Sequence, residues 1–192
     1  CAFYFSKGIT SVAGTTMTMG YEDYKKAAET IGDYMEQVEN HNLIGINMEG
    51  PFLSAAKKGA HDPQYIIDVS QEKMDELNKL AKGHFLIVDV APERPGAIEF
   101  IERNSKDFVI SVAHTAADYE KAMEAFGAGA TEVTHLFNAM NGLGHRDPGV
   151  PGAAFASGAN VEMICDGIHI HPTVMKMVYR MMGDHLMVIS DS

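Results

Sequence analysis

Short apolar runs rich in β-branched residues alternate along the chain with segments whose apolar residues recur at helical spacing. The range 109–140 shows this clearly, because it contains two such runs that end in His114 and His135. The segment between them has a helical pattern followed by glycines, which predicts a helix and its end. Strands joined by a helix are normally parallel, so both histidines are expected at one carboxyl-terminal sheet edge, where α/β folds carry their sites.

The same alternation predicts about seven strands separated by helices. Strands are expected over residues 9–18, 43–49, 84–93, 107–115, 131–140 and 185–192, and a strand followed by a loop over 161–171. Helices are expected over residues 2–5, 21–42, 70–82, 95–104, 116–130, 153–157 and 172–182, with a long polar loop over 52–66. The apolar runs are nearly continuous, as in strands that are buried on both faces.

This number of strands favours a barrel over an open sheet. A complete (β/α)₈ barrel takes about 250 residues, and the chain has 192. A doubly wound sheet usually has roughly five or six strands and a glycine-rich phosphate loop after the first, and the sequence has no such loop. We therefore predict an incomplete (β/α)₈ barrel over residues 1–192. Because the chain begins with Cys1 and ends with Ser192 just after a strand, we expect it to be a piece of a longer protein.

Composition narrows the classes of partner. With 46% hydrophobic and 21% charged residues the chain is an ordinary globular one, and its formal net charge of −11 argues against a nucleic acid partner. No apolar run approaches the roughly 18 residues that span a bilayer, and no secretory signal is present. The two cysteines form no framework. We therefore expect a cytoplasmic protein without a membrane partner.

Acidic and imidazole side chains stand at the ends of the predicted strands. They are Glu49, Glu93, His114, His135, Asp166 with His169, and Asp191. Buried charges are costly unless they are paired or metal-bound. We expect Glu49, His114 and His135 to bind a divalent metal ion with an open coordination position, with Asp191 as the general base. Metal-assisted hydrolysis is the reaction class that this arrangement predicts.

Each of these residues also has a structural interpretation. A single histidine at a strand end is most often a hydrogen-bonded structural residue, and it is the combination with Glu49 and Asp191 that favours a site. Glu93 fits an ion pair in a loop or at the barrel rim as well as a metal ligand. Arg146, in a glycine-rich loop, fits either a solvated cation or an anion-binding residue.

Five segments, in this order, carry a more specific resemblance. They are MEGPFLSAAKKGAHDP, SVAHTAA, VTHLFNAMNGLGHRDPGVPGAA, CDGIHIHP and ISDS. They resemble the N-acetylglucosamine-6-phosphate deacetylase family of the amidohydrolase superfamily, over essentially the whole chain. The resemblance implies removal of the acetyl group from N-acetylglucosamine 6-phosphate. It also implies a metal-bearing (β/α)₈ barrel with a small β-sandwich domain built from both chain ends.

The resemblance also implies roles for individual residues. Glu49, His114 and His135 would hold the metal, and Asp191 would be the catalytic acid and base. Substrate contacts would come from His61, Asn138, Ala139, Arg146 and His169. Arg146 and the Asn138–Ala139 backbone would bind the phosphate, with the two histidines on the sugar and the acetamide. In the family the arginine loop can act across a dimer interface, so a homodimer is expected.

The chain departs from the family pattern in its extent and its last motif. The first barrel strand, the final helix and the sandwich domain are absent from residues 1–192, and the motif around Asp191 reads SDS where TDA or TDS is more usual. Some members carry a His-x-His pair on that first strand, so one or two ions remain open. The metal itself could be zinc, iron or manganese.

Two other functions fit the sequence less well. Another amidohydrolase could act on a different amide, in the manner of dihydroorotases or aminoacylases, but these usually rely on a carboxylated lysine where this chain has Glu49. A non-catalytic module that binds a sugar phosphate would need neither the three metal ligands nor Asp191.

Overall fold

The computed structural model describes residues 2–39 and 41–191, so Cys1, Asn40 and Ser192 lie outside the described part. One parallel sheet contains seven strands in chain order. The strands are β1 (Val12–Thr16), β2 (Leu43–Met48), β3 (Phe85–Val90), β4 (Val109–Val112), β5 (Glu132–Val133), β6 (Asn160–Ile164) and β7 (Leu186–Ile189). The helices are α1 (Ala2–Ser6), α2 (Tyr21–Gln37), α3 (Gln71–Leu80), α4 (Ala97–Asn104), α5 (Tyr119–Ala128), α6 (Gly149–Ser157) and α7 (Pro172–Met182).

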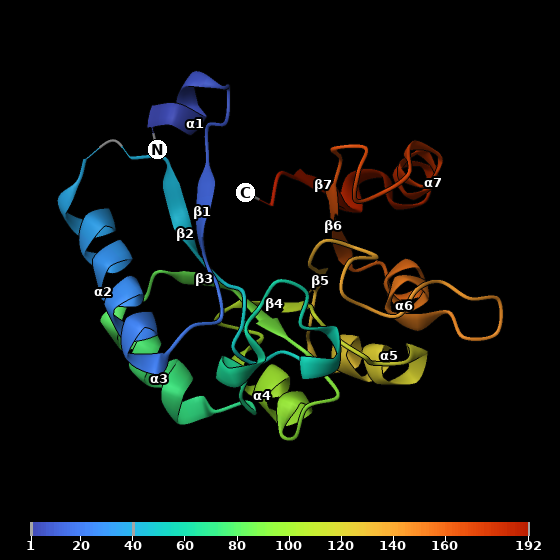
Figure 1. Ribbon diagram of the computed structural model, residues 1–192, viewed down its shortest axis with the longest axis horizontal. Coiled ribbons are helices and arrows are strands. Elements are labelled where there is room, and N and C mark those ends of the chain that lie inside the picture. Colours follow the sequence, from blue (N-terminus) through green and yellow to red (C-terminus); the bar gives the residue numbers. More distant parts are fainter. Residues whose placement is uncertain (1, 40, 192) are drawn as a thin grey trace.

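The sheet is curled, and helices α2–α7 lie on its outer side (Figure 1). Each strand pairs only with its neighbours in sequence. Within residues 2–39 and 41–191, β1 and β7 do not pair with each other. The two strands therefore flank an open seam (Figure 1). This is an incomplete (β/α)₈ barrel, which confirms the predicted fold class. All seven strand ends lie on one rim of it.

Local chemistry explains where several helices begin. The Ser70 and Asp118 side chains accept hydrogen bonds from the backbone N–H groups of Lys73 and Lys121, which satisfies donors in the first turns of α3 and α5. Helix α2 packs closely on the end of α3 because it has Gly32 at the contact. A Cβ at this position would lie 2.8 Å from the Ala81 carbonyl carbon and oxygen.

The clearest difference from the predicted elements is at residues 131–140. Only Glu132 and Val133 form a strand there. His135, Phe137 and Ala139 have positive φ angles of 34°, 75° and 50°, and a backbone with these angles cannot continue an extended strand. The prediction of a strand up to Met140 was therefore wrong.

Two helices also differ in length from the prediction, since α2 ends at Gln37 rather than near residue 42, and α6 begins at Gly149 rather than 153. Two short 3₁₀ turns, Ala55–Lys57 and Pro63–Tyr65, divide the predicted polar loop. Among the described residues, no helix has the length and apolar character needed to cross a membrane.

Candidate active site

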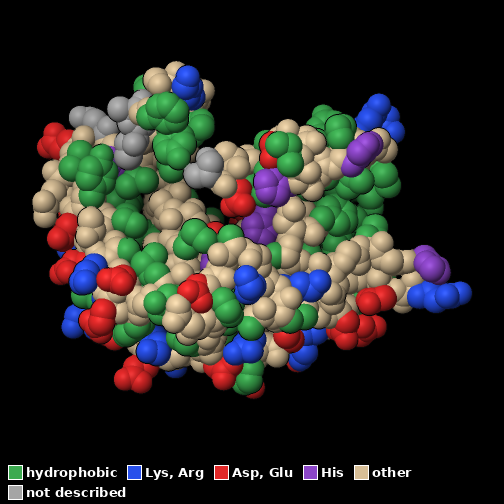
Figure 2. All heavy atoms as spheres, viewed as in Figure 1, with side chains coloured by type: hydrophobic (Ala, Val, Ile, Leu, Met, Phe, Trp, Pro, Cys, Tyr) green, Lys and Arg blue, Asp and Glu red, His purple; other side chains and the backbone are tan. Residues whose placement is uncertain are grey.

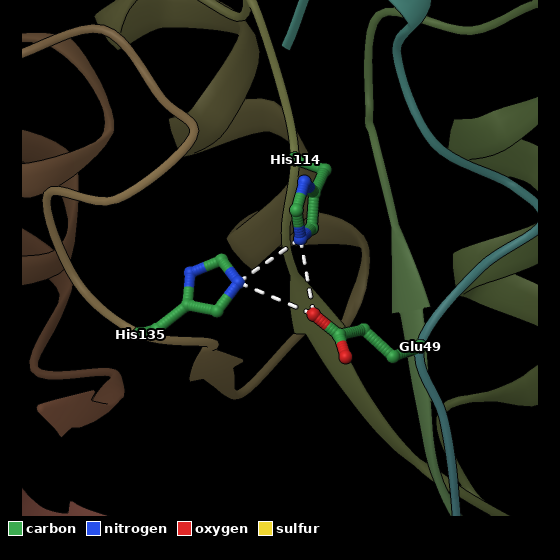
Figure 3. Close-up of side chains that lie close together, drawn as sticks. All are labelled: Glu49, His114 and His135. Atoms are coloured by element: carbon green, nitrogen blue, oxygen red, sulfur yellow. Dashed lines mark hydrogen bonds and ion pairs between the residues drawn. The ribbon is translucent and has the colours of Figure 1, made fainter. Parts of the chain in front are cut away.

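Three side chains from three strand ends converge at the rim. Glu49 directly follows β2, and His114 and His135 each come two residues after the end of β4 and β5. All three are buried. His114 Nε2 lies 3.0 Å from Glu49 Oε1 and 3.0 Å from His135 Nε2, and His135 Nε2 lies 3.4 Å from Glu49 Oε1 (Figure 3). The sequence prediction that these residues meet is confirmed.

The hydrogen bonds around His114 show what this group of atoms can hold. His114 Nδ1 donates to the Lys57 carbonyl oxygen at 2.9 Å, so a neutral His114 carries its lone pair on Nε2 and aims it at the Glu49 carboxylate. Acceptor atoms that face each other repel unless a proton or a cation lies between them. Two ligands at about 2.0–2.1 Å from a tetrahedral ion are about 3.3 Å apart, close to the observed separations. Glu49, His114 and His135 therefore fit a divalent metal ion.

The same contacts determine the charges in the group. Burial alone would raise the pKa of Glu49, but the imidazoles of His114, His135 and His61, which hydrogen-bond to the carboxylate when they carry a proton toward it, outweigh burial and lower this pKa well below its usual range. Burial disfavours protonation of His135, yet the negative charges of Glu49 and Asp191 raise its pKa overall. Glu49 is thus ionised at neutral pH, as a metal ligand must be.

His61 lies beside this group. Its side chain is buried, its ring centroid is 4.5 Å from that of His114, and its Nε2 is 3.6 Å from Glu49 Oε1. The Thr18 backbone N–H donates to His61 Nδ1 at 3.2 Å. A neutral His61 must therefore carry its proton on Nε2, which makes it a hydrogen-bond donor at the site and not a lone-pair ligand.

A cavity of about 1000 Å³ opens over these residues. Figure 2 shows the hollow near the centre of the molecule, with histidine and acidic side chains inside it. Its lining brings together most of the residues that the sequence analysis selected: Glu49, His61, His114, His135, Asn138, Ala139, His169 and Asp191. Within this group, His169 Nδ1 is 2.7 Å from Asp166 Oδ2. Hydrogen bonds from the His169 and Ile168 backbone N–H groups lower the pKa of Asp166 to about 2.

Arg146 is the exception. It is exposed in the loop between Asn141 and Pro148 and is not among the described residues that line the cavity. Its role toward the substrate stays a prediction.

Most of the backbone strain in the molecule is gathered at this rim. Of the non-glycine residues with positive φ in the described chain, Lys82 alone lies away from the rim, in the turn before β3. The others are His114, His135, Phe137, Ala139 and Asp191. Such conformations cost on the order of 1–3 kcal/mol each and persist where the surrounding structure imposes them. The site residues are thus held by their loops rather than by strand geometry.

Sequence reasoning missed several residues around the site. The Thr18 amide and the Lys57 carbonyl act through the main chain and leave no trace in residue type. Three acidic residues near the site are also buried: Asp89, Glu132 and Glu162. Each stands within an apolar strand run in the sequence, and this pattern could have identified them. Glu93 was expected as an ion pair or a ligand, but among the described residues its bonds are to the Thr115 hydroxyl and the Ala116 backbone N–H.

Comparisons with known proteins agree with this geometry. The model of the amidohydrolase family matches residues 1–189. The N-acetylglucosamine-6-phosphate deacetylase of Bacillus subtilis (strain 168) is 36% identical over 194 residues, which cover 97% of this chain and 49% of the relative. The N-acetylgalactosamine-6-phosphate deacetylase of Shewanella sp. (strain ANA-3) is 34% identical over 187 residues, covering 96% and 47%.

A solved structure shows the same fold. It is a mutant N-acetyl-D-glucosamine-6-phosphate deacetylase from Mycobacterium smegmatis in complex with N-acetyl-D-glucosamine-6-phosphate. It superposes with a TM-score of 0.88 at 33% identity, over 94% of this chain and 47% of that one. The chain spans about half the length of the curated relatives it matches. With the family model matched almost from end to end, and with a possible metal-binding triad on the rim of the barrel, the chain belongs to the amidohydrolase family.

Proposed function

We propose that this chain carries the catalytic centre of a metal-dependent deacetylase that hydrolyses N-acetylglucosamine 6-phosphate to glucosamine 6-phosphate and acetate. The observation that carries the proposal is the meeting of Glu49, His114 and His135 in a cavity also lined by Asp191. The M. smegmatis neighbour in complex with N-acetyl-D-glucosamine-6-phosphate supports the choice of substrate.

The metal would be held by Glu49, His114 and His135. A divalent ion at this position would polarise the acetamide carbonyl and make a water molecule more acidic. The donor set suits zinc, iron or manganese, with one or two ions per subunit. The main-chain groups of Lys57 and Thr18 fix the tautomers of His114 and His61, respectively.

Asp191 would move the proton. It lines the cavity, and its charge acts on His135. In this role the carboxylate accepts a proton from the attacking water as the oxygen bonds to the carbonyl carbon, and then donates it to the nitrogen as the carbon–nitrogen bond breaks. His61, with its proton on Nε2, can donate a hydrogen bond to the acetamide oxygen, which carries the developing negative charge.

The remaining cavity residues would orient the sugar and its phosphate. His169, positioned by Asp166, faces the sugar, and the backbone of Asn138 and Ala139 faces the phosphate together with Arg146. Because Arg146 does not line the cavity of its own chain, we propose that it acts on the site of a second subunit in a homodimer. Guanidinium groups recognise phosphate through paired hydrogen bonds.

Three further proposals concern the rest of the protein, its location and its partners. We propose that a further strand closes the seam between β1 and β7, as part of a longer protein with a small β-sandwich domain. A cytoplasmic location is in keeping with the exposed free thiol of Cys165. The net charge of −11 disfavours nucleic acid.

Acetate release and bound metal, measured on the same sample, test the proposal. We would use the chain alone and the chain joined to the flanking segments of the B. subtilis relative. Release of acetate that chelation abolishes and a divalent metal restores would support it. Asp191→Asn should lower turnover by about 10²–10⁴-fold while KM stays within a few-fold. Full activity in this variant would show that Asp191 is not the acid and base.

The choice of sugar needs its own comparison, because a relative that acts on the other epimer is similarly identical. N-acetylglucosamine 6-phosphate, N-acetylgalactosamine 6-phosphate and unphosphorylated N-acetylglucosamine would be assayed side by side. We expect the highest kcat/KM for the first. A higher value for the second would replace the proposed substrate with its epimer, and no activity from metal-loaded protein on any of them would point to a different amide.

A further inference from the structure

Several hydrogen bonds hold the backbone of residues 114–117. His114 has a left-handed φ of 43°, a conformation that a residue with a side chain leaves readily unless its neighbours are fixed. We call residues 114–117 the His114 loop. The Ser54 backbone N–H donates to the His114 carbonyl oxygen at 2.9 Å, and the Thr115 N–H donates to the Ala139 carbonyl oxygen at 3.0 Å.

Glu93 provides the charged contacts to this loop. Its Oε2 accepts the Thr115 hydroxyl proton at 2.5 Å, and its Oε1 accepts the Ala116 backbone N–H at 2.7 Å. The Thr115 hydroxyl is thus the donor to Glu93, and its oxygen also accepts the Ala117 N–H at 2.9 Å. Both carboxylate oxygens of Glu93 therefore act as acceptors for the two residues next to His114.

Glu93 reaches the loop from a neighbouring strand. It follows β3, three residues after Val90, whereas His114 follows β4. On the other side, the Asn141 side chain donates to the Ala116 and Ala117 carbonyl oxygens at 2.9 and 3.3 Å. The His114 loop is thus held between the end of β3 and the loop that contains Asn138 and Ala139.

We propose that Glu93 is a positioning residue for the metal site, which keeps His114 in its left-handed conformation and aims its Nε2 at Glu49. The inference rests on the proposed metal-dependent function. Without these two hydrogen bonds, His114 can relax toward negative φ, and its imidazole turns away from Glu49 and His135. The connection from Thr115 to Ala139 extends the effect to the proposed phosphate-binding backbone.

The test replaces Glu93 by Gln, which has the same shape. An amide offers one acceptor and one donor, so one of the two donors of the His114 loop would face an N–H₂ group. We expect cobalt(II) and zinc(II) to bind about tenfold more weakly. We also expect the visible absorption bands of the cobalt-loaded protein to change, because its coordination changes. The control is Asp68→Asn, which removes a carboxylate that bonds only Arg94 among the described residues, and which should leave both measurements unchanged.

Thr115 gives an independent variant if Glu93→Gln does not fold. Thr115→Val removes the hydroxyl, and with it both the bond to Glu93 and the bond from the Ala117 N–H, but it keeps the Glu93 carboxylate. Thr115→Ser keeps the hydroxyl. We expect weaker metal binding in the Val variant and wild-type binding in the Ser variant. The effects of Glu93→Gln and Thr115→Val should be less than additive, because both act on the contact between residues 93 and 115.

Three results are distinguishable. Weakened metal binding and an altered cobalt spectrum in Glu93→Gln, with an unchanged melting temperature of the metal-free protein, support the positioning role. Wild-type affinity and spectrum in both Glu93→Gln and Thr115→Val overturn it while leaving the proposed function intact. A wild-type protein that binds neither metal overturns the proposed function and this inference together.

Discussion

At the scale of single residues, the interior of the barrel carries an acid that is expensive to ionise. Glu132 is buried near Glu162 on the next strand. Burial first, and then the negative charge of Glu162, raise the pKa of Glu132 to about 7. Between pH 4.5 and 7 the folded protein therefore keeps a proton that the unfolded chain has released. Stability is lost as the pH rises through this window.

We predict that Glu132→Gln removes this pH dependence. The variant should be more stable than the wild type by roughly 2 kcal/mol at pH 8, and nearly equal to it at pH 5. Urea unfolding of the metal-free protein at the two pH values measures the difference. The exposed Glu99→Gln serves as the control, with little change at either pH. An equal effect of Glu132→Gln at both pH values would show that Glu132 does not titrate in this window.

The residue types at strand ends were sufficient to predict that Glu49, His114 and His135 meet, but not which contacts hold them in place. Glu49, His114 and His135 stand out because charged and imidazole groups interrupt apolar runs. The contacts of Thr18 and Lys57 could not be predicted, since any residue has the same amide and carbonyl. The role of Glu93 depends on the space between two loops, and strand pattern alone gives no information on this.

At the scale of elements, hydrophobic periodicity predicted which segments are helices and strands better than where they end. Helix α7 spans the predicted residues 172–182, because Pro172 begins it and Gly183 follows it. The end of β5 was predicted poorly, since the apolar run continues through Leu136 and Phe137 while the backbone turns at His135. The pattern of apolar residues indicates which positions are buried, and the buried positions continue past the end of β5 into the site.

Two glycines in helices should respond oppositely to alanine. Gly32→Ala in α2 would place a Cβ 2.8 Å from the Ala81 backbone, and we expect it to lower the free energy of unfolding by about 1–3 kcal/mol. A Cβ at Gly127 in α5 would meet no other part of the molecule within 4 Å, apart from its own helix backbone and chain neighbours. Gly127→Ala should therefore raise the free energy of unfolding by about 0.5–1 kcal/mol through helix propensity alone. Denaturant unfolding of both variants measures this, and stabilisation by Gly32→Ala would mean that α2 and α3 pack less closely.

At the scale of the whole molecule, the site joins parts that are far apart in sequence. Glu49, His114 and His135 come from strand ends distributed over β2, β4 and β5, and Asp191 comes after β7. The barrel class followed from the number of strands and their alternation with helices. Which side chains touch one another across the rim could not be predicted in this way, because these contacts depend on how far the sheet curls.

A metal ion bound at this group should therefore stabilise the fold. We predict that zinc at about 100 times its Kd raises the free energy of unfolding by about 2.7 kcal/mol. Thermal unfolding with and without zinc, after removal of metal by a chelator, measures the effect. His135→Ala should abolish the increase. An increase of the same size in that variant would mean that zinc binds elsewhere.

The main-chain hydrogen bonds around the His114 loop have a consequence for evolution. Ser54 holds this loop with its backbone N–H and Ala139 with its carbonyl oxygen. Every residue has the carbonyl, and every residue except proline has the N–H. Mutations that accumulate in distant descendants of this gene can then alter the side chain at position 54 among small residues without disturbing the site. Glu93 has no such freedom, because both of its oxygens are in use. Sequence divergence should therefore conserve glutamate at position 93 while the residue at position 54 varies.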